Sequence, residues 1–263
     1  MRIIISPAKK MRTDLSILPE SVPEYLDKAR LLLSQLRALS REELKKVWAC
    51  SDVLAEENIV NLRQMDLSLG RTPAIMAYDG IQYQYMAPET FTASMIDYVQ
   101  QNLRILSGFY GVLSPLDGIV PYRLEMQARL QIGGAKNLYD FWGSCLYQSV
   151  RSEDGIIINI ASNEYSRGVK QYLCPGDRMI TCVFGEIKGT KIVQKGVYAK
   201  MARGGMVRFL AQTGAVSPEQ MKEFCMFGYR YCPSRSDETE YVFIKESEPE
   251  VKKTHPVFEW TES

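Results

Sequence analysis

The chain begins with Arg2-Ile3-Ile4-Ile5-Ser6-Pro7, and this stretch sets the fold class. Its three isoleucines form a β-branched run that the proline ends, which predicts a first strand buried in a sheet. The run 156–160 has the same character and predicts the clearest buried strand of the chain. Polar residues follow both runs, and the carboxyl end of a buried strand is where α/β proteins place ligand sites.

Helical patterns lie between the extended ones. A capping box formed by Ser40 and Glu43 starts one helix, and Asp52 is expected to cap the next, through Met65. The spacing of apolar residues predicts further helices over 24–39, 92–103, 138–150 and 198–212. The last of these is weakened by its pair of glycines at 204–205, and a short helix is expected at Ser217.

Further strands are predicted over 74–78, 179–184, 191–198 and 241–245. Because strands and helices alternate, the fold class is α/β or mixed α+β, with a mixed sheet flanked by helices. No repeat or linker divides the chain. We therefore predict one compact domain over 1–245 and a polar, acidic C-terminal tail over 246–263.

The composition excludes most metal chemistry. The 263 residues include one histidine, His255, which lies in the polar tail. Histidine is the usual neutral-pH base and the commonest metal ligand, so a His-rich zinc site or a non-haem iron triad is excluded. The six cysteines form no C-x-x-C pair and are expected to be mostly buried. Dinucleotide-binding and P-loop glycine motifs are missing. We expect no stable metal site and no cofactor.

The expected compartment is the cytoplasm. The apolar run at the start of the chain is far too short for a secretory signal. No apolar run approaches the ~20 residues that span a bilayer, so no membrane partner is expected. Cysteines without a disulfide pattern agree with a reducing environment.

The formal net charge of +1 conceals a segregation of charge. Residues 1–12 carry four basic side chains and no acid, and residues 188–218 carry six basic side chains and no acid. The stretch from Asp237 to Ser263 is acidic, with eight acidic side chains against three lysines. A basic stretch attracts phosphate, although a charge run is also what an ordinary solvated surface looks like. The basic residues are Arg2, Lys9, Lys10, Arg12, Lys188, Lys191, Lys195, Lys200, Arg203 and Arg208.

Two polar constellations follow the buried strands. Ser6-Pro7-Ala8-Lys9 offers a Ser/Lys pair that could bind phosphate or activate a nucleophile, or form a simple turn. After the second strand, Ser162 or Asn163 is expected to cap a short helix that carries Glu164, Arg167 and Lys170. Glu164 is a candidate acid or base, or a residue that orients Arg167. An ordinary helix start explains the same pattern.

A third constellation spans residues 106–126. Gly108 and Gly111 flank an aromatic pair and predict a tight hairpin, which in a helix-hairpin-helix module lends backbone N–H groups to a DNA phosphate. A structural turn explains the glycines equally well. Arg123 and Glu125 alternate with apolar residues, so on a strand they would share one face and pair with each other.

Taken together, these motifs resemble the YaaA family of bacterial peroxide stress proteins. The resemblance runs in order from residue 1 to about residue 245. The segments that carry it are Ile5-Ser6-Pro7-Ala8-Lys9, Leu106-Ser107-Gly108, Tyr110-Gly111-Val112-Leu113, Pro115-Leu116-Asp117, Pro121-Tyr122-Arg123-Leu124-Glu125-Met126, Phe141-Trp142-Gly143, Asn159-Ile160-Ala161-Ser162 and Tyr198-Ala199-Lys200.

The resemblance implies a cytoplasmic protein that limits oxidative DNA damage during hydrogen peroxide stress and lowers available intracellular iron. It implies an α/β fold with a helix-hairpin-helix-like element and a basic cleft that binds duplex or branched DNA, mainly through backbone contacts. The expected DNA-binding residues are Lys9, Lys10, Gly108, Gly111, Arg123, Arg167, Lys170, Lys200, Arg203 and Arg208.

Two other functions stay open. The first is an enzyme that acts on nucleic acid or a nucleotide, in a polar pocket formed by Ser6, Lys9, Arg123, Glu125, Asn163 and Glu164. Its candidate catalytic residues are Ser6, Lys9, Glu125 and Glu164. The second is direct sequestration of iron, which one histidine and scattered cysteines disfavour.

Overall fold

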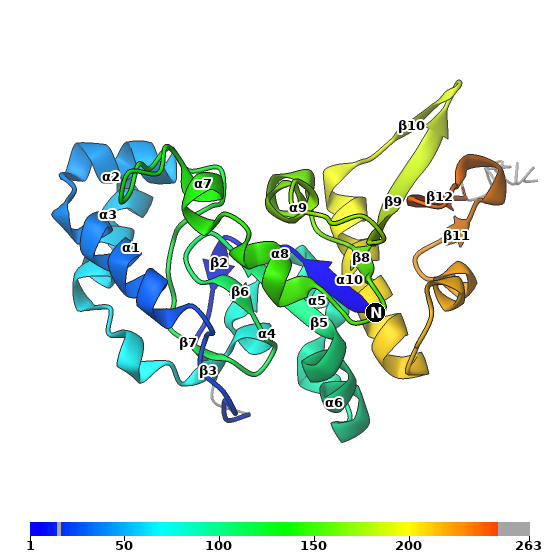
Figure 1. Cartoon of the computed structure of the whole chain (residues 1–263), viewed down its shortest axis with the longest axis horizontal. Coiled ribbons are helices and arrows are strands. Elements are labelled where there is room, and N and C mark those ends of the chain that lie inside the picture. The colour runs from blue at the N-terminus through cyan, green and yellow to red at the C-terminus, as the bar shows by residue number, and fades with distance from the viewer. Residues whose placement is uncertain (15–16, 247–263) are drawn as a thin grey trace, which may run out of the picture.

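A mixed eight-stranded sheet forms the centre of the protein, whose computed structural model describes residues 1–14 and 17–246 (Figure 1). The strand order is β11-β12-β9-β8-β1-β5-β6, and β10 pairs with β9. The five strands from β12 to β5 are parallel, while β6, β10 and β11 pair antiparallel. The bounds are β1 (Arg2–Ile5), β5 (Leu103–Ser107), β6 (Gly111–Leu113), β8 (Ile156–Asn159), β9 (Arg178–Lys188), β10 (Lys191–Val193), β11 (Tyr229–Tyr231) and β12 (Glu240–Lys245).

The direction of the connections reverses between β1 and β8. From β1 the chain continues to the parallel neighbour β5 on one side, whereas from β8 it continues to β9 on the other side. Connections that leave in opposite directions open a crevice at the carboxyl ends of the two strands. Residues that follow Ile5 and Asn159 therefore border this crevice.

Helices pack around the sheet, and three of them form a helical lobe. In Figure 1 the lobe of α1 (Leu26–Ala38), α2 (Arg41–Trp48) and α3 (Asp52–Gln64) lies at the left, and α10 (Gly196–Thr213) lies at the right. The other helices are α4 (Ala74–Ala77), α5 (Ile81–Met86), α6 (Ala93–Asn102), α7 (Leu138–Trp142), α8 (Cys145–Val150) and α9 (Asn163–Lys170).

Short elements complete the chain. Two small two-stranded sheets pair β2 (Lys10–Met11) with β4 (Tyr78–Asp79) and β3 (Thr72–Pro73) with β7 (Gly118–Ile119). Four 3-10 turns are η1 (Leu67–Leu69), η2 (Pro88–Thr90), η3 (Pro218–Glu223) and η4 (Pro233–Arg235) within the described ranges. The β2–β4 pair matters for the site, because it ties the residues after β1 to those before α5.

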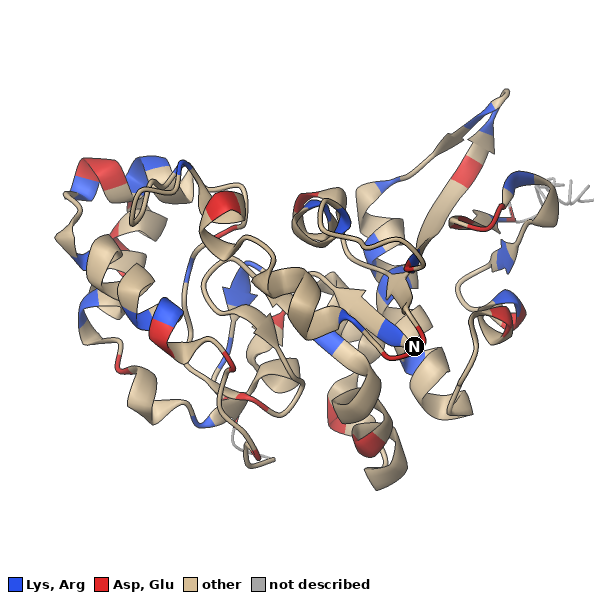
Figure 2. Cartoon of the chain, in the orientation of Figure 1, with Lys and Arg blue, Asp and Glu red and all other residues tan. Residues whose placement is uncertain are grey.

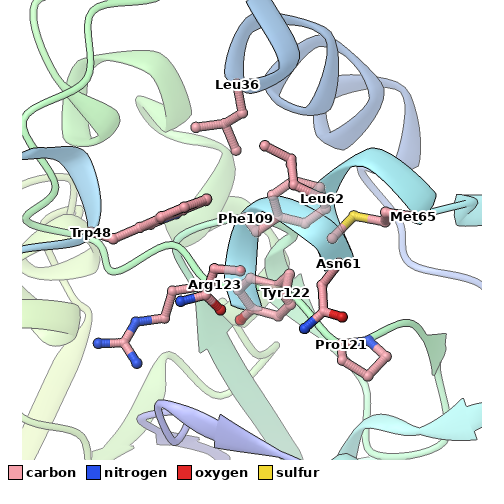
Figure 3. A pocket seen from close by; sticks show the side chains of 10 residues that line it. Leu36, Trp48, Asn61, Leu62, Met65, Phe109, Pro121, Tyr122 and Arg123 are labelled. Atoms are coloured by element: carbon pink, nitrogen blue, oxygen red, sulfur yellow. The ribbon is translucent and has the colours of Figure 1, made fainter. Parts of the chain in front are cut away.

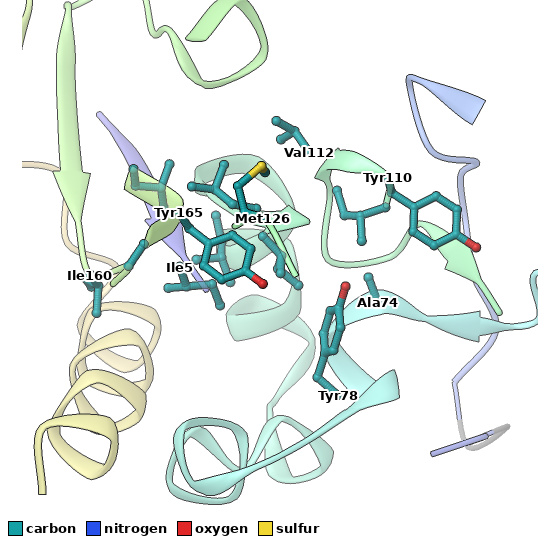
Figure 4. Packing of buried hydrophobic residues seen from close by; sticks show 14 of the residues in the cluster. Ile5, Ala74, Tyr78, Tyr110, Val112, Met126, Ile160 and Tyr165 are labelled. Atoms are coloured by element: carbon teal, nitrogen blue, oxygen red, sulfur yellow. The ribbon is translucent and has the colours of Figure 1, made fainter. Parts of the chain in front are cut away.

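The core runs without interruption from the sheet into the loops that follow it (Figure 4). Ile5, Met126 and Ile160 are fully buried, and Tyr165 of α9 packs with them. This packing fixes the two strand ends and the extended segment that leads to Met126 against one another. Burial of large side chains of this kind contributes roughly 1.5–3 kcal/mol each.

Most predicted elements are present, with four local corrections. The capping box of Ser40 and Glu43 is confirmed, but Ser51 caps α3 in place of Asp52. Residues 74–78 were predicted as a strand, but residues 74–77 form the buried helix α4 and only Tyr78 lies in a strand, β4, because a fully apolar run has no period that separates a strand from a helix. The predicted helix 138–150 is broken at Gly143 into α7 and α8. The predicted strand 191–198 ends at Val193.

The glycine pair 204–205 does not weaken α10, which is continuous over 18 residues. A Cβ atom on Gly204 would collide with the backbone carbonyl of Gln82 in α5. Glycine is therefore required here by the close approach of two helices. The contact brings the first half of α10 to the edge of the crevice.

The predicted hairpin at Gly108 and Gly111 is confirmed as a turn, but strands β5 and β6 flank it where a helix-hairpin-helix module has helices. Both glycines are buried. The N–H groups of Phe109 and Tyr110 donate to the hydroxyl of Ser107 at 3.2 and 2.9 Å, so they have no free capacity for a phosphate. Gly108 and Gly111, which were predicted as DNA contacts, thus lie in a buried turn whose neighbouring N–H groups are already paired within the protein.

Two further expectations need comment. The thiols were expected to be mostly buried, but Cys182 alone is buried, whereas Cys174 and Cys225 are exposed. His255 and most of the acidic tail lie outside the described residues. Over residues 1–14 and 17–246, no helix has the length and apolar character needed to cross a bilayer.

Candidate functional site

A cavity of about 400 Å³ lies at the carboxyl ends of β1 and β8. We call it the strand-end pocket. Its walls come from the loop after β1, the β4–α5 segment, the extended segment before Met126, the start of α9, and the first half of α10. The lining residues are Ser6, Pro7, Ala8, Lys9, Lys10, Asp79, Gly80, Ile81, Gln82, Tyr83, Tyr122, Arg123, Leu124, Glu125, Ser162, Glu164, Tyr165, Lys200 and Arg203.

Ser6 ties the two strand ends together at one side of the pocket. Its Oγ accepts the backbone N–H of Ser162 at 2.8 Å and donates to the Ser162 hydroxyl at 3.2 Å. Its carbonyl oxygen accepts the Tyr83 hydroxyl at 3.0 Å. The Ser6 side chain is thus part of the frame, and among the described contacts no hydrogen bond joins it to Lys9 as a nucleophile pair would require.

Two carboxylates enter the pocket from different segments. Glu125 accepts Lys9 Nζ at 2.7 Å on one oxygen and Arg123 Nη2 at 3.1 Å on the other, so the predicted pairing of Arg123 with Glu125 is confirmed. Glu164 accepts the N–H of Gln127 at 3.3 Å. Burial raises the pKa of Glu164, and the nearby charge of Glu125 raises it further. Glu125 is therefore paired with two cations, whereas its neighbour Glu164 forms no ion pair with a described residue and ionises less readily than a free carboxyl group.

Helix α10, on which Figure 2 shows basic positions in blue, contributes two cations to the pocket, Lys200 and Arg203. The helix carries no acidic residue, and neither cation has an ion-pair partner among the residues of the described ranges. The Nε atom of Arg203 is buried without a hydrogen-bond partner. Burial lowers the pKa of Arg203, opposed only by the thiol of Cys182. No carboxylate compensates this guanidinium.

Tyrosine rings supply much of the remaining wall. The hydroxyl of Tyr122 bonds to Ser107 at 2.6 Å and to Tyr78 at 2.8 Å, and burial raises the pKa of Tyr122 to about 12. Tyr83 and Tyr165 are buried to 3% and 6% exposure. Because the hydroxyls of Tyr83 and Tyr122 are occupied elsewhere, these rings offer apolar surface to the pocket.

The structure brings eight of the candidate site residues to this one pocket. They are Ser6, Lys9, Lys10, Arg123, Glu125, Glu164, Lys200 and Arg203. Asn163 is exposed at the start of α9 and does not line it. Arg167 and Lys170 are exposed on the same helix, with Arg167 placed over the ring of Tyr139 at 5.2 Å and unpaired with Glu164.

Arg208 and the β9–β10 hairpin lie apart from the pocket. One nitrogen of Arg208 donates to the carbonyls of Met86 and Ala87 and to the hydroxyl of Thr90, so this side chain joins α10 to the turn after α5. Lys195 pairs with Glu186 at 2.7 Å. Of the six basic residues in 188–218, only Lys200 and Arg203 reach the pocket.

Sequence reasoning missed the wall formed by Asp79, Gln82 and Tyr83. These residues follow the segment that was mistaken for a strand, so the start of α5 was overlooked. The signal that could have found them is Gly80, a chain-turning residue between Tyr78 and the pair Tyr83 and Tyr85. Asp79 also pairs with Lys10 at 2.6 Å, which lowers the pKa of Asp79.

A smaller cavity of about 70 Å³ lies between the helical lobe and the strand-end pocket, and Arg123 and Tyr122 line both (Figure 3). The indole Nε1 of Trp48 and the Nε of Arg123 are buried without partners among the described residues. Both groups border a space of the size of a few water molecules. Within residues 1–14 and 17–246, no cluster of three or more His, Cys, Asp and Glu is placed to hold a metal ion.

Known proteins match this chain over most of its length. A sequence model of the family described as peroxide stress protein YaaA matches residues 1–235. A UPF0246 protein from Agathobacter rectalis is 51% identical over 244 residues, which cover 92% of this chain and 98% of the relative. A UPF0246 protein from Desulfitobacterium hafniense is 50% identical over 246 residues, covering 93% and 98%. One from Lactiplantibacillus plantarum is 50% identical over 245 residues, covering 93% and 99%.

Proposed function

Because the chain belongs to the peroxide stress protein YaaA family, we propose that it is a DNA-binding protein of the hydrogen peroxide stress response. It binds duplex or branched DNA through the phosphate backbone at the mouth of the strand-end pocket. In this way it limits oxidative damage to DNA. The site of action is the cytoplasm.

One observation carries the proposal. The two acid-free basic segments, 1–12 and 188–218, are distant in sequence, yet both contribute side chains to one pocket. Its lining includes five basic residues against three acidic ones. Two cationic segments that converge on a concave surface produce the positive field that concentrates a polyanion.

The basic side chains differ in how they would meet a phosphate. Lys9 and Lys10 are exposed, and their pairing with Glu125 and Asp79 holds each ammonium in place. Lys200, like Arg167 and Lys170 of α9, is exposed and has no acidic partner within the described part of the chain. Contacts of this kind fix the position of the protein on DNA without reading bases.

The test is a titration of a fluorescent duplex, and of a four-way junction, with the full chain at several salt concentrations. If four or five phosphates are neutralised, the logarithm of affinity falls with the logarithm of salt concentration with a slope of about −4, so affinity drops roughly 250-fold between 50 and 200 mM. Affinity undetectable at 50 mM salt for both DNA forms would contradict the proposal.

The proposal includes the lowering of available intracellular iron that the resemblance implies. Cells that lack the protein are expected to hold more chelatable iron after peroxide exposure than cells that carry it. The measurement is the chelatable iron signal by electron spin resonance, with survival in peroxide followed in parallel. Equal iron signals in the two strains would contradict the proposed lowering of iron. DNA binding would still be tested separately by the titration.

A further inference from the structure

Arg203 lies within the strand-end pocket, where its position differs from that of the exposed lysines at the mouth. Its Nε is buried, whereas Lys9, Lys10 and Lys200 are exposed. Arg208, on the same helix, is by contrast hydrogen-bonded, because one of its nitrogens has three oxygen acceptors. The Nε of Arg203 has no hydrogen-bond partner, and no acidic side chain of the described residues influences the pKa of Arg203.

An unpaired guanidinium in a partly buried position is costly for the free protein. The carboxylates of the pocket do not relieve this cost, since the pKa of Arg203 is influenced by Cys182 and by no acid. Glu125 is already engaged by Lys9 and Arg123. The pocket therefore holds a cation, Arg203, that lacks an anion, and two carboxylates, Glu125 and Glu164, that do not pair with it.

Much of the remaining wall of the pocket is aromatic and apolar. Tyr83, Tyr122 and Tyr165 line the cavity together with Ile81 and Leu124. The cavity volume of about 400 Å³ lies in the range of small-molecule sites and exceeds what an inorganic anion fills. A bound inorganic phosphate would satisfy Arg203 and leave the tyrosine wall exposed to water.

We propose that the strand-end pocket binds a free nucleoside monophosphate. Its phosphate pairs with the guanidinium of Arg203, its planar base packs on the tyrosine wall, and its ribose hydroxyls or exocyclic amino group donate to the carboxylates of Glu125 and Glu164. An arginine meets phosphate with two parallel hydrogen bonds, which gives the contact direction as well as strength. The position at the reversal between β1 and β8 is where open α/β sheets bind ligands.

This inference does not depend on DNA binding. The DNA surface proposed above uses the exposed lysines at the mouth, whereas the nucleotide phosphate uses Arg203 inside the pocket. The two sites share one opening, so a bound nucleotide is expected to weaken DNA binding by occupying the space in front of Lys200. If either nucleotide binding or DNA binding is absent, the other can still be measured.

The test is calorimetric titration of the full chain with AMP, GMP, CMP and UMP, each compared with its nucleoside and with inorganic phosphate. At least one monophosphate is expected to bind, and more tightly than its nucleoside or phosphate by about tenfold or more, since each of those lacks one half of the contacts. The inference is overturned if no monophosphate binds at millimolar concentration. It is equally overturned if inorganic phosphate binds as tightly as the nucleotides.

Variants at Arg203 locate the phosphate. Arg203→Gln is expected to weaken the monophosphate about tenfold or more and to leave nucleoside affinity unchanged, while Arg203→Lys restores part of the loss. Arg63→Gln, an exposed arginine on α3, is the matched control and should bind as the parent does. Because Arg203→Gln removes an uncompensated charge, the free variant should unfold at no lower denaturant concentration than the parent. Unchanged monophosphate affinity in a folded Arg203→Gln protein would contradict the assignment.

Discussion

The hydroxyl of Ser6 accepts the backbone N–H of Ser162 at 2.8 Å, although 156 residues separate them in the chain. The first residue follows β1 and the second follows β8. Their hydrogen bond therefore links the ends of β1 and β8, where the connections reverse direction. It holds together the two walls of the strand-end pocket that follow these strands. Both residues stand in motifs that carry the family resemblance.

Substitution of Ser6 by alanine tests this relationship. The Ser162 N–H would lose its acceptor in a part-buried position, which costs about 1–3 kcal/mol of unfolding free energy. Urea denaturation of Ser6→Ala measures the loss. The control is Ser34→Ala, at an exposed position of α1, which should change stability by less than about 0.5 kcal/mol. Equal stabilities of the two variants would show that the Ser6–Ser162 contact contributes nothing.

The close contact of α10 with α5 predicts an inverted glycine effect. Gly204→Ala should destabilise the protein by about 1–3 kcal/mol, even though alanine is the better helix former by about 1 kcal/mol, because the new methyl group meets the backbone of Gln82. Gly196, at the start of the same helix, faces open space. Gly196→Ala should therefore stabilise by about 0.4–1 kcal/mol. Thermal melts of both variants compare them, and a stabilising Gly204→Ala would refute the close approach.

The pKa of Glu164 predicts a dependence of stability on pH. Burial raises this pKa above its ordinary value of 4.5, so the folded protein binds a proton that the unfolded chain has released. Stability from this group is complete below the unfolded pKa and is lost as pH rises through the folded pKa. Glu164→Gln should remove that loss and make the protein more stable at pH 7 by less than about 1 kcal/mol, after allowance for screening in the open pocket. Both proteins are unfolded in urea at pH 4 and pH 7, and a variant less stable at pH 7 would contradict the assignment.

The sheet could be predicted from the sequence because its central strands are unambiguous. Three consecutive isoleucines at residues 3–5 and another three at 156–158 permit little except a buried strand, and both lie in the centre of the sheet. The polar residues after them were recognised as site candidates for the same reason. The order of the strands, which brings Ser6 to Ser162, is a long-range property and cannot be derived from local pattern.

The errors have physical causes that act over long distances. Residues 74–77 are completely buried, so no polar face marks a helical period, and the segment was mistaken for a strand. Gly108 looked like a phosphate-binding turn, but it lacks a side chain because the carbonyl of Leu124 lies 2.5 Å from the place of its Cβ. Arg208 looked free in sequence, whereas backbone carbonyls on another segment satisfy it.

The most direct test of the central claim is the affinity of Lys10→Glu with Lys200→Glu for duplex DNA at low salt. The two lysines come from the two basic segments, and both line the strand-end pocket. The control is Lys46→Glu with Arg63→Glu, which changes the charge equally on exposed positions of the helical lobe. We predict that the first pair weakens binding at least tenfold and lowers the salt slope by about two, while the control stays within about threefold of the parent. Equal affinities for the two double variants would contradict the claim that the two basic segments bind DNA together at this pocket.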